Sequence, residues 1–312
     1  MGMKTLHSAS GVTITEMAGV FRTALIAAVL VVALVPGAAV AKKKRKPGIY
    51  VKPGPNAIAK AIDRARPGQT IRIRRGRYRE ALVIDKPLRL MAAGRVRPVI
   101  DGACRTRVTV KVVSPRVTLR RLKVVGADEG FGSFPAEVDF SQVNTGRARG
   151  LVVRDTCDAQ YGINVFDTGP VQILGNRARG GFSDAGIYVG GIQSTLGGAL
   201  RVRGNVSYGS NRGMIVEQVA ASADVRVTAN RFRSNIIPGI GTPTGLFLHV
   251  ANGVMIFGNH ISGNGVYGID LDPASNFNRL LNNSVSGNPT NVRDQGTGNC
   301  GSGNIGFSIS PC

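Results

Sequence analysis

A phrase that returns along the second half of this 312-residue chain constrains its fold more than any other feature. Two alternating aliphatic residues are followed, three positions on, by an asparagine, as in VQILGN at 171–176. The marker asparagines are spaced 29, 25, 29 and 24 residues apart: Asn176, Asn205, Asn230, Asn259 and Asn283. A second phrase, a glycine that opens a short apolar strand, keeps pace with them at Gly162, Gly186, Gly213, Gly245 and Gly268. The chain is therefore a repeat protein with insertions between its units.

Each repeat unit contains two short strands and several turns, without helical periodicity. A unit of this size cannot bury its own apolar face, so neighbouring units must stack into one continuous core. This pattern predicts an all-β fold, a right-handed single-stranded parallel β-helix. Asparagine suits the sharp turns because it tolerates the left-handed conformation, and its amide can bond to the amide in the next coil. Leucine-rich repeats have a similar period but need leucines at fixed offsets, which this sequence lacks.

The N-terminal segment reads as a targeting signal rather than as part of the repeat domain. Arg22 precedes an apolar run over 24–35, and small residues up to Ala41 form a cleavage site. Twelve apolar residues fall short of the roughly 20 that span a bilayer. We expect a signal peptide over 1–41, with Met1 and Met17 both open as its start, and a secreted or cell-envelope protein. A basic tail over 42–53 and a β-helix domain over 54–312 follow, with an N-terminal cap over 54–102.

All four cysteines lie beyond the predicted cleavage site, where export permits disulfides. Three pairings are open from the sequence alone. We favour Cys300–Cys312, because this bridge would close the exposed end of the solenoid over 300–312, and Cys104–Cys157 then follows by elimination. A metal site is the weaker interpretation, since no Cys-x-x-Cys spacing occurs.

The formal net charge of +22 is concentrated in the first third of the mature chain. Residues 42–123 hold 25 Lys/Arg against 4 acids, whereas residues 124–312 hold 13 of each. An exported basic protein is expected to meet an acidic polysaccharide or cell-wall polymer rather than nucleic acid. The basic tail allows at most a peripheral membrane contact. Nothing in the repeat pattern demands an oligomer, and we expect a monomer.

A short amphipathic helix near residues 57–65 and several alternating strands precede the repeats. We expect the helix to cap the first coil, because solenoid ends need a cover. The run AIAKAIDRARPGQTIRIRRGRYREALVIDKPLRL, followed by asparagine-marked coils, resembles the pectin-lyase-like superfamily of right-handed parallel β-helices, close to its secreted NosD-like and PbH1-repeat members. The resemblance covers roughly residues 48–299.

This superfamily includes lyases, epimerases and hydrolases of acidic polysaccharides, but their catalytic motifs do not carry over. The adjacent aspartates and the Gly-His-Gly of polygalacturonases are missing from the sequence. Their Arg-x-Lys is matched only by Arg121-Leu-Lys123, which precedes every candidate acid. Asp272-Pro-Ala-Ser matches the start of the epimerase motif but lacks its histidine. The resemblance therefore specifies the fold and leaves the activity open.

Strand alternation points to one concentration of acid and base groups on the outer face of the glycine-led strands. The outward residues form a first column of Asn164, Tyr188, Ile215, Phe247 and Asp270, and a second column of Phe166, Gly190, Glu217, His249 and Asp272. Strands stack about 4.8 Å apart, so Glu217, His249 and Asp272 would form a contiguous row with Asp270 beside it. Glu137 and Asp139 would extend this face, but the sequence around them does not fix their register.

The predicted row suggests catalysis or binding on an acidic glycan. Glu217, His249, Asp272 and Asp270 are the candidate catalytic acids and bases. The candidate substrate-binding residues are Tyr188, Phe166, Phe247, Asn164 and Arg293. The sequence establishes no cofactor, although carboxylates flanking a histidine could bind a divalent cation such as calcium.

Two hypotheses of different class follow from the sequence. In the first, the protein binds or processes an extracellular acidic polysaccharide by lyase, epimerase or hydrolase chemistry at the row. In the second, it is a non-catalytic adhesive or scaffolding solenoid of the cell envelope, and the row is a solvated strand face. The missing family motifs favour the second hypothesis, and the alignment of the row favours the first.

Overall fold

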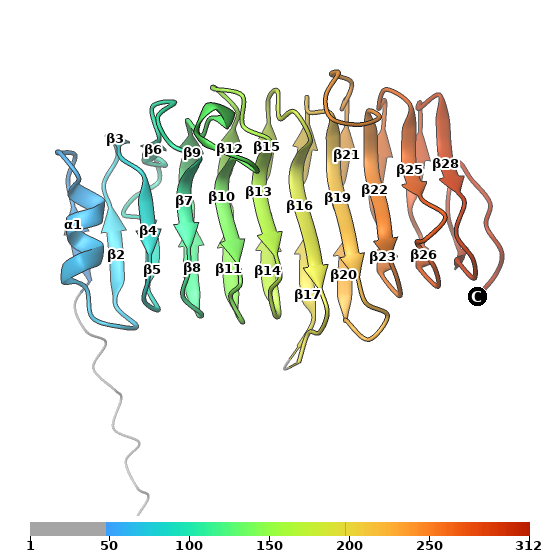
Figure 1. Ribbon diagram of the computed structural model, residues 1–312, viewed down its shortest axis with the longest axis horizontal. Coiled ribbons are helices and arrows are strands. Elements are labelled where there is room, and N and C mark those ends of the chain that lie inside the picture. The colour runs from blue at the N-terminus through green and yellow to red at the C-terminus, as the bar shows by residue number, and fades with distance from the viewer. Residues whose placement is uncertain (1–47, 197) are drawn as a thin grey trace, which may run out of the picture. The chain divides into compact units, whose positions relative to one another are not determined.

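The structure, a computed structural model, describes residues 48–196 and 198–312. Within these residues the coils from β2 to β28 each contribute one strand to each of three parallel sheets, which we name A, B and C, and β1 and β29 extend sheet A at its two ends (Figure 1). Consecutive coils stack strand on strand in the same direction, so every sheet runs along the solenoid. The predicted fold class, a right-handed parallel β-helix, is confirmed. The predicted signal peptide and residues 42–47 of the basic tail lie outside the described residues.

Each sheet consists of the strands that occupy the same position in successive coils. Sheet A contains β1 (Ile49–Val51), β2 (Thr70–Ile73), β5 (Arg89–Ala92), β8 (Val117–Arg120), β11 (Gly146–Arg149), β14 (Val171–Leu174), β17 (Leu200–Arg203), β20 (Val225–Thr228), β23 (Met255–Phe257), β26 (Arg279–Leu281) and β29 (Cys300–Ser302). Sheet B contains β3 (Arg77–Arg79), β6 (Val99–Asp101), β9 (Lys123–Val125), β12 (Val152–Arg154), β15 (Arg177–Arg179), β18 (Val206–Tyr208), β21 (Arg231–Arg233), β24 (His260–Ser262) and β27 (Ser284–Ser286). Sheet C contains β4 (Leu82–Ile84), β7 (Val108–Val112), β10 (Ala136–Ser141), β13 (Tyr161–Phe166), β16 (Ala185–Ile192), β19 (Arg212–Val219), β22 (Thr244–Ala251), β25 (Tyr267–Leu271) and β28 (Thr290–Asp294).

The alternating aliphatic residues of the repeat phrase fill the interior of the solenoid. In sheet A, the second aliphatic of each phrase aligns with that of the next coil, as Val227 does with Ile256, and both are fully buried. Burying one such side chain stabilises the fold by about 1.5–3 kcal/mol. Because every coil adds the same contacts, the core continues from one coil to the next without a gap.

The marker asparagines stack in one column at the corner between sheets A and B. In each step of the column, the amide nitrogen of one asparagine donates to the amide oxygen of the next at 3.0 Å. The same oxygen also accepts the backbone N–H of the preceding asparagine, as Asn230 Oδ1 does from Asn205 at 2.9 Å. Asn283 extends the column to Asn304. The side chains thus satisfy backbone groups that a sharp corner would leave unpaired.

The helix α1 (Ala57–Arg64) packs beside the first coils, near the expected position. Its buried face consists of Ile58, Ala61 and Ile62. The Glu80 carboxylate accepts hydrogen bonds from Ile58 N at 3.0 Å and Ala59 N at 2.9 Å, which satisfies free N–H groups at the helix start. One difference from the expectation lies before the helix. Residues Ile49–Val51, expected within the basic tail over 42–53, pair with β2 as the first strand of sheet A.

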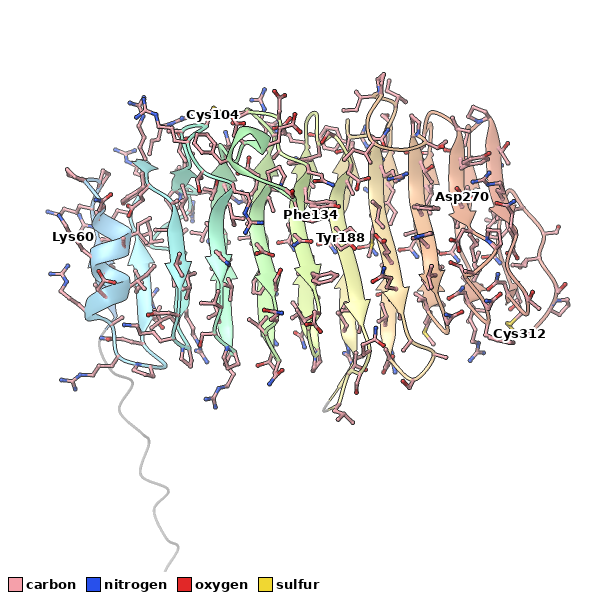
Figure 2. The ribbon with its side chains drawn as sticks, viewed as in Figure 1. Lys60, Cys104, Phe134, Tyr188, Asp270 and Cys312 are labelled. Atoms are coloured by element: carbon pink, nitrogen blue, oxygen red, sulfur yellow. A yellow bond between two sulfur atoms is a disulfide. The ribbon has the colours of Figure 1, made fainter. Side chains whose placement is uncertain are left out.

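Both favoured disulfides are present. Cys104 is bonded to Cys157 with a Cα–Cα distance of 5.5 Å, and Cys300 to Cys312 with one of 4.8 Å. The second bridge joins β29, the last strand of sheet A, to the last residue of the sequence, at the C-terminal end of the solenoid (Figure 2).

We expect the Cys312→Ser variant to loosen the last coil first. A bridge that closes a loop of this size contributes about 3 kcal/mol, and its loss acts locally in a solenoid whose coils contact only their neighbours. Phe307 packs against the end of the core, so chymotrypsin should cleave there early, while the fully buried Phe232 stays protected. Mass spectrometry of limited digests measures the order of cleavage. Simultaneous cleavage at both residues would contradict this prediction.

Candidate functional site

The outer face of sheet C brings together the polar and aromatic residues that the sequence analysis singled out. Cross-strand registers align one outward column through eight strands: Lys111, Asp139, Asn164, Tyr188, Ile215, Phe247, Asp270 and Arg293. The expected register is therefore right for this column. Its exposure is not as expected, because Ile215 is only 2% exposed and Tyr188 8%. Both belong to an apolar cluster on the outer face that also includes Ala136, Tyr161 and Ala185.

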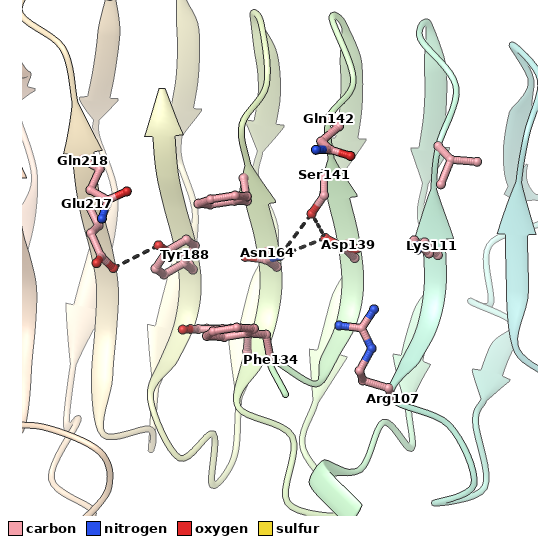
Figure 3. A pocket seen from close by; sticks show the side chains of 13 residues that line it. Arg107, Lys111, Phe134, Asp139, Ser141, Gln142, Asn164, Tyr188, Glu217 and Gln218 are labelled. Atoms are coloured by element: carbon pink, nitrogen blue, oxygen red, sulfur yellow. Dashed lines mark hydrogen bonds between the residues drawn. The ribbon is translucent and has the colours of Figure 1, made fainter. Parts of the chain in front are cut away.

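A groove of about 540 Å³ lies over this face between β7 and β19 (Figure 3). It is lined by Arg107, Lys111, Val113, Phe134, Asp139, Ser141, Gln142, Tyr161, Asn164, Phe166, Tyr188, Glu217 and Gln218. We call it the sheet C groove. It crosses several strands and so follows the direction in which coils stack, which suits an extended ligand better than a compact one.

The polar side chains on the floor of the sheet C groove are held by one another. Asn164 Nδ2 donates to Asp139 Oδ1 at 2.8 Å, and Ser141 Oγ donates to the same oxygen at 2.5 Å (Figure 3). Tyr188 donates its hydroxyl to Glu217 Oε2 at 2.9 Å. Each carboxylate keeps further lone pairs that can accept hydrogen bonds from ligand hydroxyl groups.

The aromatic side chains give the groove apolar surface. Phe134 is 59% exposed and Phe166 is 40% exposed, whereas the Tyr161 and Tyr188 rings pack against each other with centroids 4.8 Å apart. Burial, followed by the nearby Glu217 carboxylate, raises the pKa of Tyr188 above its usual value. Tyr188 therefore stays protonated near neutral pH and acts as a hydrogen-bond donor rather than as a base.

Two cations lie at the N-terminal end of the groove. Arg107 precedes β7 and donates from Nη1 to the carbonyl oxygen of Ser133 at 2.9 Å. Lys111 is the cross-strand neighbour of Asp139, but its ammonium forms no ion pair within the described residues. A carboxylate on a ligand would find charge-assisted donors here.

The predicted row of Glu217, His249 and Asp272 is contiguous in the structure, but it extends beyond the sheet C groove. Glu217 and His249 are cross-strand partners, but only Glu217 lines the groove. His249 Nδ1 lies 2.5 Å from Asp272 Oδ2. Asp272 also accepts from Ser275 Oγ at 2.7 Å and from Val250 N at 3.2 Å. Burial raises the pKa of Asp272, but these hydrogen bonds outweigh it and lower the pKa overall. The aspartate thus stabilises the turn after β25.

The remaining predicted residues sort into two groups. Tyr188, Phe166 and Asn164 line the groove together with Glu217, whereas Phe247, Asp270 and Arg293 do not. Arg293, expected to hold a substrate carboxylate, donates from Nε and Nη2 to both oxygens of Asp270 at 2.7 Å. Asp270 is 2% exposed and has no free face for a substrate. Phe247 stacks on His249, with ring centroids 5.8 Å apart.

The N-terminal half of the groove was not predicted from the sequence; it includes Arg107, Lys111, Phe134, Ser141 and Gln142. Two irregularities hide this half. A 3-10 helix, η1 (Glu129–Phe131), interrupts the coil before β10, and β10 carries Glu137 where later strands carry the marker glycine. A signal was nevertheless available, because Val138 and Phe140 alternate as the inward pair of this strand.

Comparisons with known proteins agree with this architecture. The family model described as "Periplasmic copper-binding protein (NosD)" matches residues 123–304, more than half of the chain. The chain belongs to the NosD family. No curated protein matches the chain in sequence.

Among solved structures, this NosD-family chain is similar to XylC in complex with xylose, with a TM-score of 0.61 and 11% identity over 78% of the chain. The match covers 64% of XylC, so the chain spans just under two thirds of that protein's length. A PL6 family alginate lyase, AlyGC, matches with a TM-score of 0.42 and 13% identity over 83% of this chain and 40% of the lyase. The A-module of the Azotobacter vinelandii mannuronan C-5 epimerase AlgE4 matches with a TM-score of 0.39 and 16% identity over 85% of this chain and 97% of the module. At 11% identity the likeness to XylC shows the fold alone.

The copper implied by the NosD family does not fit the residues described here. In residues 48–196 and 198–312 there is no group of three or more His, Cys, Asp or Glu side chains that could hold a metal ion, so calcium has no support either. The four cysteines are in disulfides, and among the described His, Cys, Asp and Glu side chains His249 forms a hydrogen bond with Asp272 alone. The same part of the chain contains no helix that is long and apolar enough to cross a membrane.

Proposed function

We propose that this NosD-family protein is exported to the cell envelope and binds a linear acidic polysaccharide in the sheet C groove. The observation that carries the proposal is the combination of exposed aromatic rings, carboxylate and amide acceptors, and two cations in one elongated groove. Aromatic rings pack on the apolar faces of sugars, and the acceptors pair with sugar hydroxyl groups. Lys111 and Arg107 supply the charge that selects an acidic sugar over a neutral one.

Binding without turnover is the form of this hypothesis that the contacts support. A lyase or epimerase needs a group that removes a proton, but Tyr188 is held protonated by burial and by Glu217, and the Asp139 and Glu217 carboxylates already accept hydrogen bonds from neighbouring side chains. The His249–Asp272 pair, which has acid and base chemistry, is not part of the groove lining. The disulfides and the signal-like segment support an exported location.

We expect Lys111→Ala and Phe166→Ala each to weaken binding of oligogalacturonate or mannuronate oligomers about tenfold. Lys111→Ala removes a hydrogen bond between charged groups, which contributes about 1.5–3 kcal/mol. Phe166→Ala removes an aromatic ring that packs on a sugar face. A loss of about 1.4 kcal/mol corresponds to a factor of ten in affinity. Isothermal titration calorimetry measures the affinities. The matched control is Phe257→Ala, since Phe257 is an equally exposed aromatic residue on sheet A, 43% exposed.

Two outcomes would contradict the proposal. Equal affinity for a neutral glucan of the same length would show that the cations do not select an acidic sugar. Loss of binding in His249→Ala with full binding in Lys111→Ala would place the site at the predicted row and not in the groove, because Lys111 lines the groove and His249 does not.

A further inference from the structure

Charge is distributed very unequally over the three sheets. Among the described strands, sheet A carries nine Arg and no acid, and sheet B carries eight Lys/Arg and the single acid Asp101. Sheet C, by contrast, carries three Lys/Arg and five acids. Along the sequence the excess positive charge lies in the first third of the mature chain, but in the structure cations also continue along sheet B to Arg231 and Arg233 of β21.

In one outward column of sheet B a cation recurs at every second coil, whereas the adjacent column adds Arg154 and Arg179 in consecutive coils. The cross-strand registers align Arg77, Val99, Lys123, Val152, Arg177, Val206 and Arg231 in one outward column. Strands stack about 4.8 Å apart, so successive cations are about 10 Å apart along the solenoid. The valines between them are half-buried and leave apolar surface in the gaps.

Most of these cations lack a protein partner. Arg77 pairs with Asp101, but the guanidinium groups of Arg177 and Arg231 have no hydrogen bond or ion pair with any other described residue. In the adjacent column, Arg179 Nε is buried without a hydrogen-bond partner. Burial and then the neighbouring Arg179, Arg154 and Arg77 lower the pKa of Lys123, which shows that the positive charges reinforce one another. A surface of this kind attracts anions strongly.

We propose that the outer face of sheet B binds an extended polyanionic glycan that lies along the solenoid, with one anionic group for every second coil. In an extended β-linked glycan, the length of a disaccharide is close to the spacing of the cations, so an anion on every second sugar can meet each cation in turn. The half-buried valines then face the apolar sides of the sugar rings. A lipid headgroup layer has no such period along one direction. This site is separate from the sheet C groove and does not depend on it.

Hyaluronan fragments test the proposal, because they carry one carboxylate per disaccharide. We expect affinity to rise from the tetrasaccharide to the octasaccharide and then to level off, since the column from Arg77 to Arg231 spans six coil steps, about 29 Å. Calorimetry at low salt measures this series on the exported full-length protein. Arg177→Glu and Arg231→Glu should each reduce octasaccharide affinity about tenfold and reduce its dependence on salt.

The matched control changes the same amount of charge elsewhere. Lys60→Glu and Arg66→Glu alter exposed residues on or just after α1 and should leave octasaccharide affinity within twofold (Figure 2). The effect of Arg177→Glu should persist in the Lys111→Ala background, which separates this site from the sheet C groove. An equal loss of affinity in the control variants, or an affinity that is independent of fragment length, would show that the surface attracts anions non-specifically and would contradict the proposal. Binding to phosphatidylglycerol vesicles without binding to hyaluronan would assign it to a membrane and overturn the proposal.

Discussion

Asn230→Ala is expected to lower the free energy of unfolding by about 4 kcal/mol. The side chain of Asn230 takes part in four hydrogen bonds: from Oδ1 it accepts from the backbone and amide nitrogens of Asn205, and from Nδ2 it donates to Val202 O and to Asn259 Oδ1. Asn230 is 1% exposed. Alanine would leave the Asn205 backbone N–H buried without a partner and would weaken the corner in three consecutive coils.

The control for this prediction is the same substitution at the end of the same column. Asn304 accepts from Asn283 and donates to Leu280 O, but it is only half-buried, so water can replace these bonds. We expect Asn304→Ala to lower stability by about 1 kcal/mol. Urea unfolding followed by circular dichroism measures both variants. A loss at Asn230 no greater than that at Asn304 would show that the column contributes little to stability.

The fold was predictable because only a few residue types fit each structural position of the repeat, so the repeat is visible in the sequence. A buried corner that must pair its backbone groups favours asparagine, and a strand that faces the core alternates aliphatic residues. The marker glycines have an equally direct cause. A Cβ at Gly162 would lie 2.5 Å from the Gly186 carbonyl oxygen, and one at Gly213 would lie 2.5 Å from that of Gly245. Larger residues do not fit where consecutive coils approach so closely.

The candidate site was only partly predictable, although the register of its column was right. Register places Cα atoms opposite one another, but it does not decide which partner a side chain prefers. Asp270 and Arg293 were expected to face a substrate, yet opposite charges in adjacent strands pair with each other, as they do here. Asp272 lies beside His249 as expected, but it also accepts hydrogen bonds from its own turn, as an aspartate before a proline readily does.

Glu137 explains why the sequence did not reveal the N-terminal half of the groove. It stands at the glycine position of β10, where it is fully buried. Its carboxyl group lies within hydrogen-bond distance of Thr109 Oγ1 at 3.1 Å and of Gly126 N at 2.8 Å. Thr109 aligns with Glu137 in the preceding strand, so these two coils accommodate side chains where later coils accommodate none. Because these two coils contain a buried carboxyl group, their stability depends on pH differently from that of the later coils.

Stability is expected to fall as pH rises from about 4.5 to about 8, and Glu137→Gln is expected to remove most of this fall. Burial raises the pKa of Glu137 from 4.5 to about 8, against the opposing effect of its hydrogen bonds from Thr109, Ala127 and Gly126. Between these two pH values the unfolded chain has released the proton that the folded protein still holds, so raising the pH favours unfolding. At about 1.4 kcal/mol for each pKa unit, the loss is on the order of 5 kcal/mol.

The glutamine variant tests this because its amide is neutral at every pH and can form the same contacts. Its Oε1 can accept from Gly126 N, and its Nε2 can donate to Thr109 Oγ1, which itself lies 3.2 Å from Val125 O. We expect the variant and the wild type to be similarly stable at pH 4 and the variant to be more stable at pH 8.5. Urea unfolding at a series of pH values measures the difference. Glu129→Gln, the same change at an exposed residue of η1, should leave the pH dependence of stability unaltered. If stability depends on pH in the same way in the wild type and in Glu137→Gln, the buried carboxyl group titrates as it does in the unfolded chain, and the prediction is wrong.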